Sequence, residues 1–284
     1  MSLDFPPIQY DLMPTHPLKP GQIRTGYPAL AEVIASAIAR GARRVALEGY
    51  VGVRWPQFRA TLADALQKAG VELEWHFTEE WLLPPDEVLE RIKPSLGIGD
   101  PLFGRLYEGD LSDFFQAGWQ VPPPSEKAQI VYGPGAALSK PYDLLVYVDV
   151  PKDVIQQRAR EGVITNLGAA APESSGEMYK RFFFIDWPVL NRHKARLLPS
   201  IDWYVDATDE SAPAMMGGAD LRGALDDLAV NWFRVRPWFL PGPWGGQFLR
   251  RSIRGLDQDV PNYAWSYELI TPENGLVFES SGSR

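Results

Sequence analysis

The chain has no cysteine among its 284 residues and only three histidines. The absence of cysteine excludes disulfide bonds, thiolate metal sites and cysteine nucleophiles. His16, His76 and His193 stand far apart and share no metal-ligand motif. We therefore expect no zinc centre in this chain, and we interpret His193 as a surface histidine.

Long apolar runs and an excess of positive charge are also missing. No apolar run approaches the roughly 18 residues of a membrane-spanning helix, and no charged-then-apolar leader is visible. The net charge of −8 disfavours a broad nucleic-acid surface. We expect a globular cytoplasmic protein without membrane or nucleic-acid partners, in which local arginines hold any small anionic ligand.

Strand and helix patterns alternate between residues 25 and 212. The predicted strands are Val45–Glu48, Val71–Phe77, Gln129–Tyr132, Asp143–Asp149 and Asp202–Asp206. This alternation predicts an α/β fold, with a three-layer parallel sheet and helices on both faces. Ligands of such sheets bind beyond the carboxyl ends of the strands.

Two segments flank this domain. Residues 1–24 are rich in proline and lack periodicity, so we expect an extended arm. Residues 213–284 predict a further amphipathic helix and then an irregular, aromatic-rich extension. Its proline-rich start, Phe233–Gly246, excludes a long helix or a central strand. Residues 263–278 predict a short β-hairpin with a turn near Pro272–Gly275.

The most informative motif is a two-glycine loop between the first strand and a helix that starts at Pro56. This layout is typical of a phosphate-binding loop, in which backbone N–H groups and a helix N-terminus hold an anion. The candidate phosphate- or nucleotide-binding residues are Gly49, Tyr50, Val51, Gly52, Val53 and Arg54. The alternative is a tight turn that needs glycine for its backbone alone.

Several further residues are candidates for a site. Asp100 is a candidate catalytic or hydroxyl-binding residue, or a turn former before a proline. Gly133 and Gly135 predict either close approach to a substrate or a simple loop. Asp110 and Asp113 are interpreted as helix caps or solvated groups.

Charged residues near the fourth strand complete the set. Arg158 and Arg160 stand two apart, which predicts different helix faces, and either could bind phosphate or face solvent. Glu48 and Asp149 close predicted strands and are candidate metal ligands. The polar run Tyr179–Lys194 is interpreted as an exposed helix surface.

The first 210 residues resemble the uridine kinase and phosphoribulokinase branch of P-loop kinases. The matching features are the glycine loop, Asp100–Phe103 after the second strand, Tyr132-Gly133 ending the third, and Tyr147–Asp149 followed by Arg158 and Arg160. The resemblance implies ATP and Mg²⁺ as cofactors. It also implies that Asp100 orients or deprotonates an acceptor hydroxyl and that Arg54 and the lid arginines hold phosphates.

The loop departs from that family at two functional positions. Val53 and Arg54 follow Gly52, so the catalytic lysine is absent. Trp55-Pro56 fills the place of the small hydroxyl residue that ligates Mg²⁺ in the family. Arg54 supplies one positive charge, although arginine and lysine are not interchangeable at such a position.

The C-terminal part resembles the entry segment of class I, cupin-type phosphomannose isomerases. Pro243–Gly246, Leu249 and then Asn262–Glu268 carry this resemblance over about 40 residues. The histidines of the family's metal centre are missing, so isomerase chemistry is the least favoured function. The resemblance implies a cupin isomerase domain as a partner, and a second copy of the chain is the alternative.

These features lead to two main hypotheses. In the first, the chain is kinase-like, binds a nucleotide or phosphorylated sugar and carries out phosphoryl transfer in carbohydrate metabolism. In the second, it is a catalytically inactive regulatory or ligand-binding domain associated with a mannose-6-phosphate isomerase.

Overall fold

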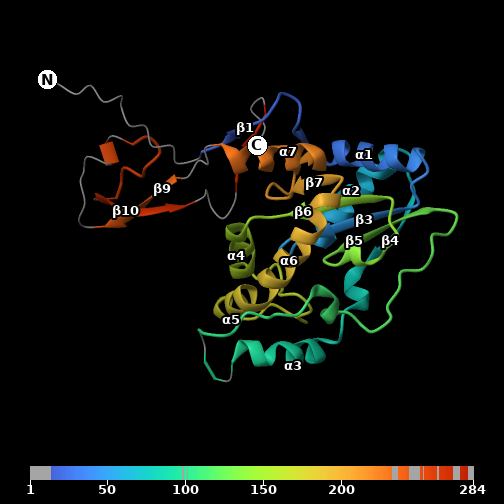
Figure 1. Ribbon diagram of the computed structural model, residues 1–284, viewed down its shortest axis with the longest axis horizontal. Helices are drawn as coiled ribbons and strands as arrows, with labels where there is room; N and C mark the ends of the chain where they lie inside the picture. Colours follow the sequence, from blue (N-terminus) through green and yellow to red (C-terminus); the bar gives the residue numbers. More distant parts are fainter. Residues whose placement is uncertain are drawn as a thin grey trace.

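The computed structural model describes residues 14–97, 99–100, 102–231, 236–242, 250–251, 253–260, 262–270 and 276–280, with only the backbone of 236–242, 262 and 264–270. Its centre is a seven-stranded sheet in the order β2-β8-β7-β6-β3-β5-β4 (Figure 1). In that order the strands are Arg24–Thr25, Ala214–Gly217, Trp203–Asp206, Leu144–Asp149, Arg44–Gly49, Ala128–Gly133 and Leu73–Phe77.

The sheet is mixed, which corrects the prediction of a wholly parallel sheet. Strands β4, β5, β3, β6 and β7 pair in parallel, as predicted. Strands β8 and β2 extend the sheet in antiparallel pairing at the β7 edge. The α/β class is therefore confirmed. The edge pairs were missed because β8 has four residues and β2 only two.

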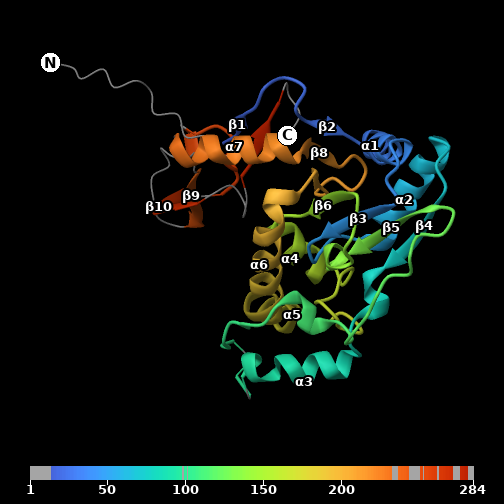
Figure 2. The ribbon, with the colours of Figure 1, turned by 45° about the vertical axis from the view of Figure 1, so that its right-hand side comes forward.

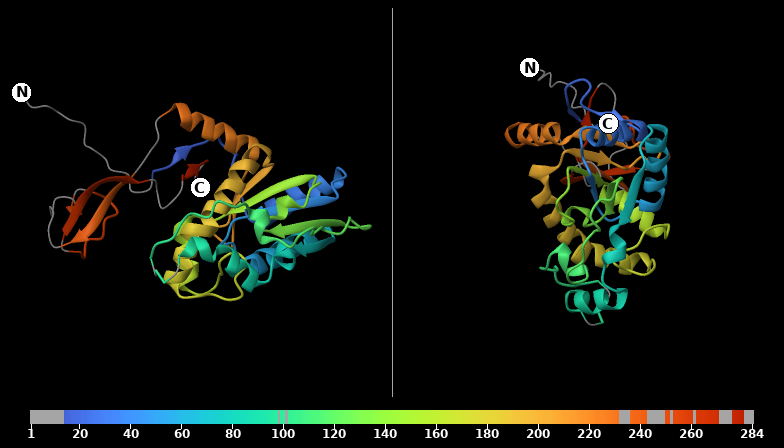
Figure 3. Two further views of the ribbon diagram at one scale, coloured as in Figure 1. Left: turned by 60° about the horizontal axis from the view of Figure 1, so that its bottom comes forward. Right: turned by 90° about the vertical axis from the view of Figure 1, so that its right-hand side faces the viewer.

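Helices cover both faces of the sheet (Figure 3). The helices are α1 (Tyr27–Ala39), α2 (Trp55–Lys68), α3 (Pro85–Leu96), α4 (Lys152–Arg160), α5 (Ser175–Arg181), α6 (Trp187–Leu197) and α7 (Gly218–Val230). Helices α1 and α2 pack together and belong to the larger core, and α6 contributes Leu190 to that core and Leu197 to a second cluster. Strands β3 and β6 are buried over their full length, which explains their nearly continuous apolar sequences.

Short helical segments complete the domain. They are the 3₁₀ turns Thr78–Trp81, Leu111–Phe114, Ala136–Leu138 and Leu198–Ser200, and the π-helix Phe182–Asp186, which joins α5 to α6. Asp110 and Asp113 form a capping box at the turn Leu111–Phe114, so their prediction as caps is confirmed. None of the helices in the described ranges is long and apolar enough to cross a bilayer.

The C-terminal extension contains a separate two-stranded ribbon (Figure 2). In this ribbon β9 (Arg236–Gly242) pairs antiparallel with β10 (Asn262–Ile270). The predicted hairpin within residues 263–278 is therefore wrong, because the partner of β10 precedes it in the chain. The predicted turn Pro272–Gly275 and the Pro243–Gly246 motif lie outside the described residues.

The N-terminal arm also pairs with the C-terminal part of the chain. Strand β1 (His16–Pro17) lies parallel to β11 (Phe278–Glu279). Beyond residue 212, α7 packs on β8, on β7 and on the 3₁₀ turn Leu198–Ser200.

Candidate functional site

The glycine loop leaves the carboxyl end of the central strand of the parallel set. Strand β3 lies between β5 and β6, with Glu48 opposite Gly133 and Gly49 opposite Val148. The chain passes from β3 to β4 on one side and from β5 to β6 across it, so the strand order changes direction at β3. Open α/β sheets bind ligands in the crevice at such a switch point.

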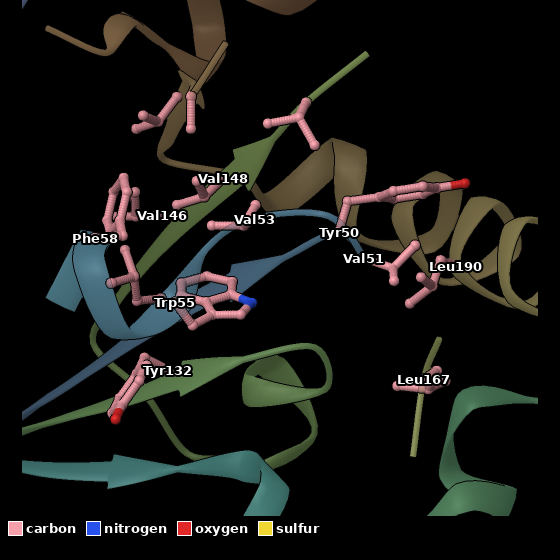
Figure 4. Packing of buried hydrophobic residues seen from close by; sticks show 14 of the residues in the cluster. Tyr50, Val51, Val53, Trp55, Phe58, Tyr132, Val146, Val148, Leu167 and Leu190 are labelled. Atoms are coloured by element: carbon pink, nitrogen blue, oxygen red, sulfur yellow. The ribbon is translucent and has the colours of Figure 1, made fainter. Parts of the chain in front are cut away.

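The space beneath the loop is filled by an indole ring. Trp55, the first residue of α2, lies under the loop and against Tyr132 of β5, with ring centroids 6.1 Å apart (Figure 4). A side chain at Gly49 would begin 2.4 Å from this ring and 2.8 Å from the Val148 carbonyl oxygen. Glycine is required at position 49 because the indole and the neighbouring strand leave no room for a Cβ atom.

The backbone N–H groups of the loop divide into two sets. Those of Gly49 and Tyr50 donate within the sheet, to Glu48 Oε1 at 3.0 Å and to the Val148 carbonyl at 3.0 Å. The N–H groups of residues 51–54 have no acceptor among the described residues. Successive unpaired donors at the start of a helix are suited to an anion.

A cavity of about 360 Å³ lies against this second set of donors. It is lined by Val51–Gln57, Phe77–Glu79, Leu82, Pro134, Gly162–Gly168 and Pro172. Cavities of this size accommodate small-molecule ligands. Its walls are partly apolar and partly polar, with the polar side chains Arg54, Gln57, Thr78, Glu79, Thr165 and Asn166. Partial burial raises the pKa of Glu79.

One cavity-lining side chain carries a buried polar group without a partner in the described structure. The indole Nε1 of Trp55 is buried and makes no hydrogen bond; in Figure 4 it is on the side of the ring that faces away from Phe58. Thr78, which is 1% exposed, brings a hydroxyl to the same cavity. Buried polar groups are normally paired, so the indole N–H indicates a ligand.

The arginines of the sequence prediction have three different placements. Arg54 borders the cavity and forms an ion pair with Glu210 at 2.9 Å. Arg158 is buried, donates to the Gly52 carbonyl at 2.7 Å and therefore holds the loop from behind. Arg160 is exposed at the end of α4 and does not line the cavity. The predicted separation of Arg158 and Arg160 onto different helix faces is confirmed.

Glu48 is fully buried and joins two loops. Its Oε1 accepts from the backbone N–H of Gly49 and, at 2.7 Å, of Gly135. Its Oε2 accepts from Ala137 N–H at 2.8 Å and lies 3.1 Å from Nε2 of His193. His193 is 7% exposed, so its interpretation as a surface histidine is wrong. The sequence predicted an exposed surface for α6 because many of its residues are polar. A helical pattern does not reveal that some of these residues have buried partners.

Asp149, at the carboxyl end of β6, is the centre of a second cluster of polar side chains. Its Oδ2 accepts from Lys194 Nζ and, at 2.6 Å, from the Tyr204 hydroxyl. The Lys194 ammonium also lies 5.6 to 5.7 Å from the ring centres of Tyr50, Tyr147 and Tyr204. Burial, followed by the Asp149 charge, raises the pKa of Tyr50, and the same two causes raise that of Tyr204. These phenols therefore act as neutral donors.

A third buried carboxylate supports the cavity wall and was missed in the sequence. Asp186, in the π-helix, accepts from Asn166 Nδ2 at 2.7 Å and from Leu167 N–H at 3.2 Å. Burial raises its pKa to about 6, against the opposing effect of Arg181 and these donors. A π-helix is often found at functional sites, but only the aspartate at its end could have been noticed in the sequence.

The remaining predicted residues lie away from the cavity or serve the loops. Asp100 is exposed, and its Oδ1 accepts from the N–H groups of Leu102 and Phe103, both at 2.8 Å. These bonds, the larger from Phe103, lower the pKa of Asp100. Gly133 and Gly135 have positive φ angles of 113° and 90° on either side of the cavity-lining Pro134.

Mg²⁺ does not fit the carboxylates proposed for it. The oxygens of Glu48 and Asp149 already accept hydrogen bonds from protein donors. In the described ranges no three His, Asp or Glu side chains are grouped so that they could hold a metal ion. Trp55 provides no hydroxyl ligand at the position where P-loop kinases have one. The loop therefore offers N–H donors to an anion but no ligand to a metal ion.

A family of unknown function matches most of the chain. The family described as a domain of unknown function (DUF8485) matches residues 26–230, which include every strand of the central sheet except β2, the glycine loop and every cavity-lining residue. No curated protein matches the chain.

Proposed function

The chain belongs to the DUF8485 family, and we propose that its α/β domain binds a small phosphorylated metabolite or nucleotide in the loop cavity without transferring the phosphate. The ligand's phosphate accepts hydrogen bonds from the N–H groups of residues 51–54, and Arg54 supplies the charge. The observation that carries this proposal is the row of unpaired N–H groups against a cavity of about 360 Å³.

An unpaired side-chain donor supports the same proposal. Trp55 Nε1 is buried and unpaired within the described structure, and the Thr78 hydroxyl lines the same cavity. An unmade hydrogen bond in a buried setting costs about 1 to 3 kcal/mol, which a ligand acceptor would recover. The apolar part of the cavity then contacts the sugar or base of the ligand.

A P-loop kinase-like scaffold is part of the proposal. It is supported by the central position of β3 and by the helix that follows its glycine loop. Phosphoryl transfer is the less favoured function. Its family mechanism needs a lysine and a hydroxyl in the loop, where this chain has Val53, Arg54 and Trp55. Asp100, the family's acid or base, caps its own turn and does not border the cavity.

We further propose that this binding serves a regulatory role in cytoplasmic carbohydrate metabolism, beside a phosphomannose isomerase. This part rests on the resemblance of the C-terminal segment alone. Co-purification of the chain with a cupin-type isomerase would support it, and independent migration of the two at micromolar concentration would oppose it.

Calorimetric titration with a hexose 6-phosphate, a nucleoside monophosphate and ATP tests ligand binding. Trp55→Phe keeps an aromatic ring but removes the N–H donor, so we expect about five-fold weaker binding from the loss of one hydrogen bond. Trp75→Phe is the matched control, because Trp75 does not border the cavity. Equal losses in the two variants, or ATP consumption by the wild type, would contradict the proposal.

A further inference from the structure

A second, smaller pocket lies beside the glycine loop, next to α1. Its volume is about 30 Å³, and it is lined by Tyr27, Val53, Arg54, Gln57, Phe58, Thr61, Arg158, Ala207 and Glu210. It shares Arg54 with the larger cavity, but Tyr27, Arg158 and Glu210 border this pocket alone. Its principal feature is a fork of two guanidinium groups around one carboxylate.

The buried arm of the fork is held rigidly. Arg158 is 7% exposed; its Nη1 donates to the Gly52 carbonyl at 2.7 Å and its Nη2 to the Ala207 carbonyl at 3.2 Å. Nη2 also lies 3.0 Å from Oε1 of Glu210. That oxygen is buried but receives no aligned hydrogen bond, so Glu210 satisfies Arg158 poorly.

The second arm is more open. Arg54 Nη1 pairs with Glu210 Oε2 at 2.9 Å, and both side chains are about one third exposed. The two arginines therefore share Glu210 as their ion-pair partner among the described residues. Burial lowers the pKa of Arg158, the Glu210 charge opposes this shift, and repulsion by Arg54 adds to it.

Tyr27 adds a hydroxyl donor to the pocket. It is 4% exposed and lines the pocket beside the two arginines. Burial and then the Glu210 charge raise its pKa to about 12, so the hydroxyl keeps its proton and remains a donor. A hydroxyl donor beside two arginines favours an anion with several acceptor oxygens.

Glu210 can leave the fork without disturbing the core. It lies in the turn between β7 and β8, and its neighbours Asp209 and Ser211 are exposed. The turn is stabilised by its own bonds, since Asp209 Oδ1 accepts from Ser211 N–H at 2.9 Å. Movement of the carboxylate would enlarge a pocket that is otherwise too small for a phosphate.

We infer that the Arg54–Arg158 fork is an anion-binding site for one phosphate group, which exchanges with the Glu210 carboxylate. The phosphate oxygens accept from both guanidinium groups and from the Tyr27 hydroxyl. This site goes beyond the proposed function, because Arg158 and Tyr27 hold its anion and do not border the cavity, although Arg54 is common to both sites.

Titration with inorganic phosphate at constant ionic strength tests the inference. Glu210→Gln removes the competing charge, and we expect about five-fold tighter phosphate binding than in the wild type, as for loss of one exposed ion pair. Glu161→Gln is the matched control; it removes an exposed charge near Arg158 that forms no ion pair with it. Equal phosphate affinity in Glu210→Gln and wild type would overturn the inference.

Two further variants identify the pocket that gains affinity. Adding Tyr27→Phe to Glu210→Gln should abolish the gain, whereas adding Thr78→Val, which alters only the cavity, should leave it intact. If Thr78→Val abolishes the gain in phosphate affinity and Tyr27→Phe leaves it, the assignment is overturned. It is also overturned if Glu210→Gln raises the affinity for acetate as much as the affinity for phosphate. If Glu210→Gln does not fold, Glu210→Asp, with a shorter side chain, should show a smaller gain, and none would count against the site.

Discussion

Replacement of Glu48 by glutamine distinguishes a structural anchor from a metal ligand at the end of β3. The four groups around this buried carboxylate are the N–H groups of Gly49, Gly135 and Ala137, and Nε2 of His193. A glutamine has one acceptor oxygen, so its amide nitrogen must face some of these donors. If the oxygen keeps Gly49 and Gly135, the amide nitrogen faces the N–H of Ala137.

The expected cost follows from these contacts. One buried donor without an acceptor costs about 1 to 3 kcal/mol, and the hydrogen bonds that remain lose their charge assistance. We therefore expect Glu48→Gln to lower the free energy of unfolding by about 2 to 4 kcal/mol. A carboxylate kept for a metal would behave oppositely, because neutralising an uncompensated buried charge stabilises a protein.

Urea denaturation followed by circular dichroism measures this change. Glu126→Gln is the control, since its side chain is exposed and surface substitutions shift stability by about 0.5 kcal/mol or less. The midpoint for Glu48→Gln should fall while the slope of the transition stays constant. A variant as stable as wild type, or more stable, would refute the structural role of Glu48.

Two other predictions concern the loop and the cavity wall. Gly49→Ala should destabilise the protein by about 1 to 3 kcal/mol, because its Cβ would lie 2.4 Å from the Trp55 ring; Gly176→Ala, at an open position of α5, should not destabilise it, as thermal unfolding of both will show. The pKa of Asp186 is raised to about 6 from 3.8, so the folded state binds this proton more tightly and stability falls as pH rises from about 4 to 6. The shift corresponds to about 3 kcal/mol of unfolding free energy. Urea titrations at pH 4.5 and 7 should show that this free energy depends less on pH in Asp186→Asn than in the wild type. An equal pH dependence in the two proteins would contradict the assignment to Asp186.

Much of the fold could be predicted because the central strands are buried on both faces. The apolar runs of β3, β5 and β6 are nearly continuous, and helical patterns separate them. The antiparallel strands β2 and β8 could not be found in this way. Strands as short as Arg24–Thr25 contain too few residues to show an alternation of apolar and polar side chains. The partner of β10 also depends on long-range pairing, which local turn signals do not specify.

The site was less predictable for a different reason. The glycine spacing pointed to the loop, but the sequence could not show that Trp55 fills the space beneath it. The polar residues of α6 looked like a solvated face. Lys194 pairs with Asp149, and His193 lies beside Glu48, through contacts 45 and 145 residues away in sequence. Such pairings arise only when the helix packs on the strand ends.

The central claim is that the loop cavity binds a phosphorylated small molecule without a metal ion. Its most direct test is calorimetric titration of the wild type with a nucleoside monophosphate and a hexose 6-phosphate, each in excess EDTA and again in Mg²⁺. The account predicts saturable binding of at least one compound, with the same affinity in both buffers. Absence of heat with every phosphorylated compound, or binding that requires Mg²⁺, would contradict it.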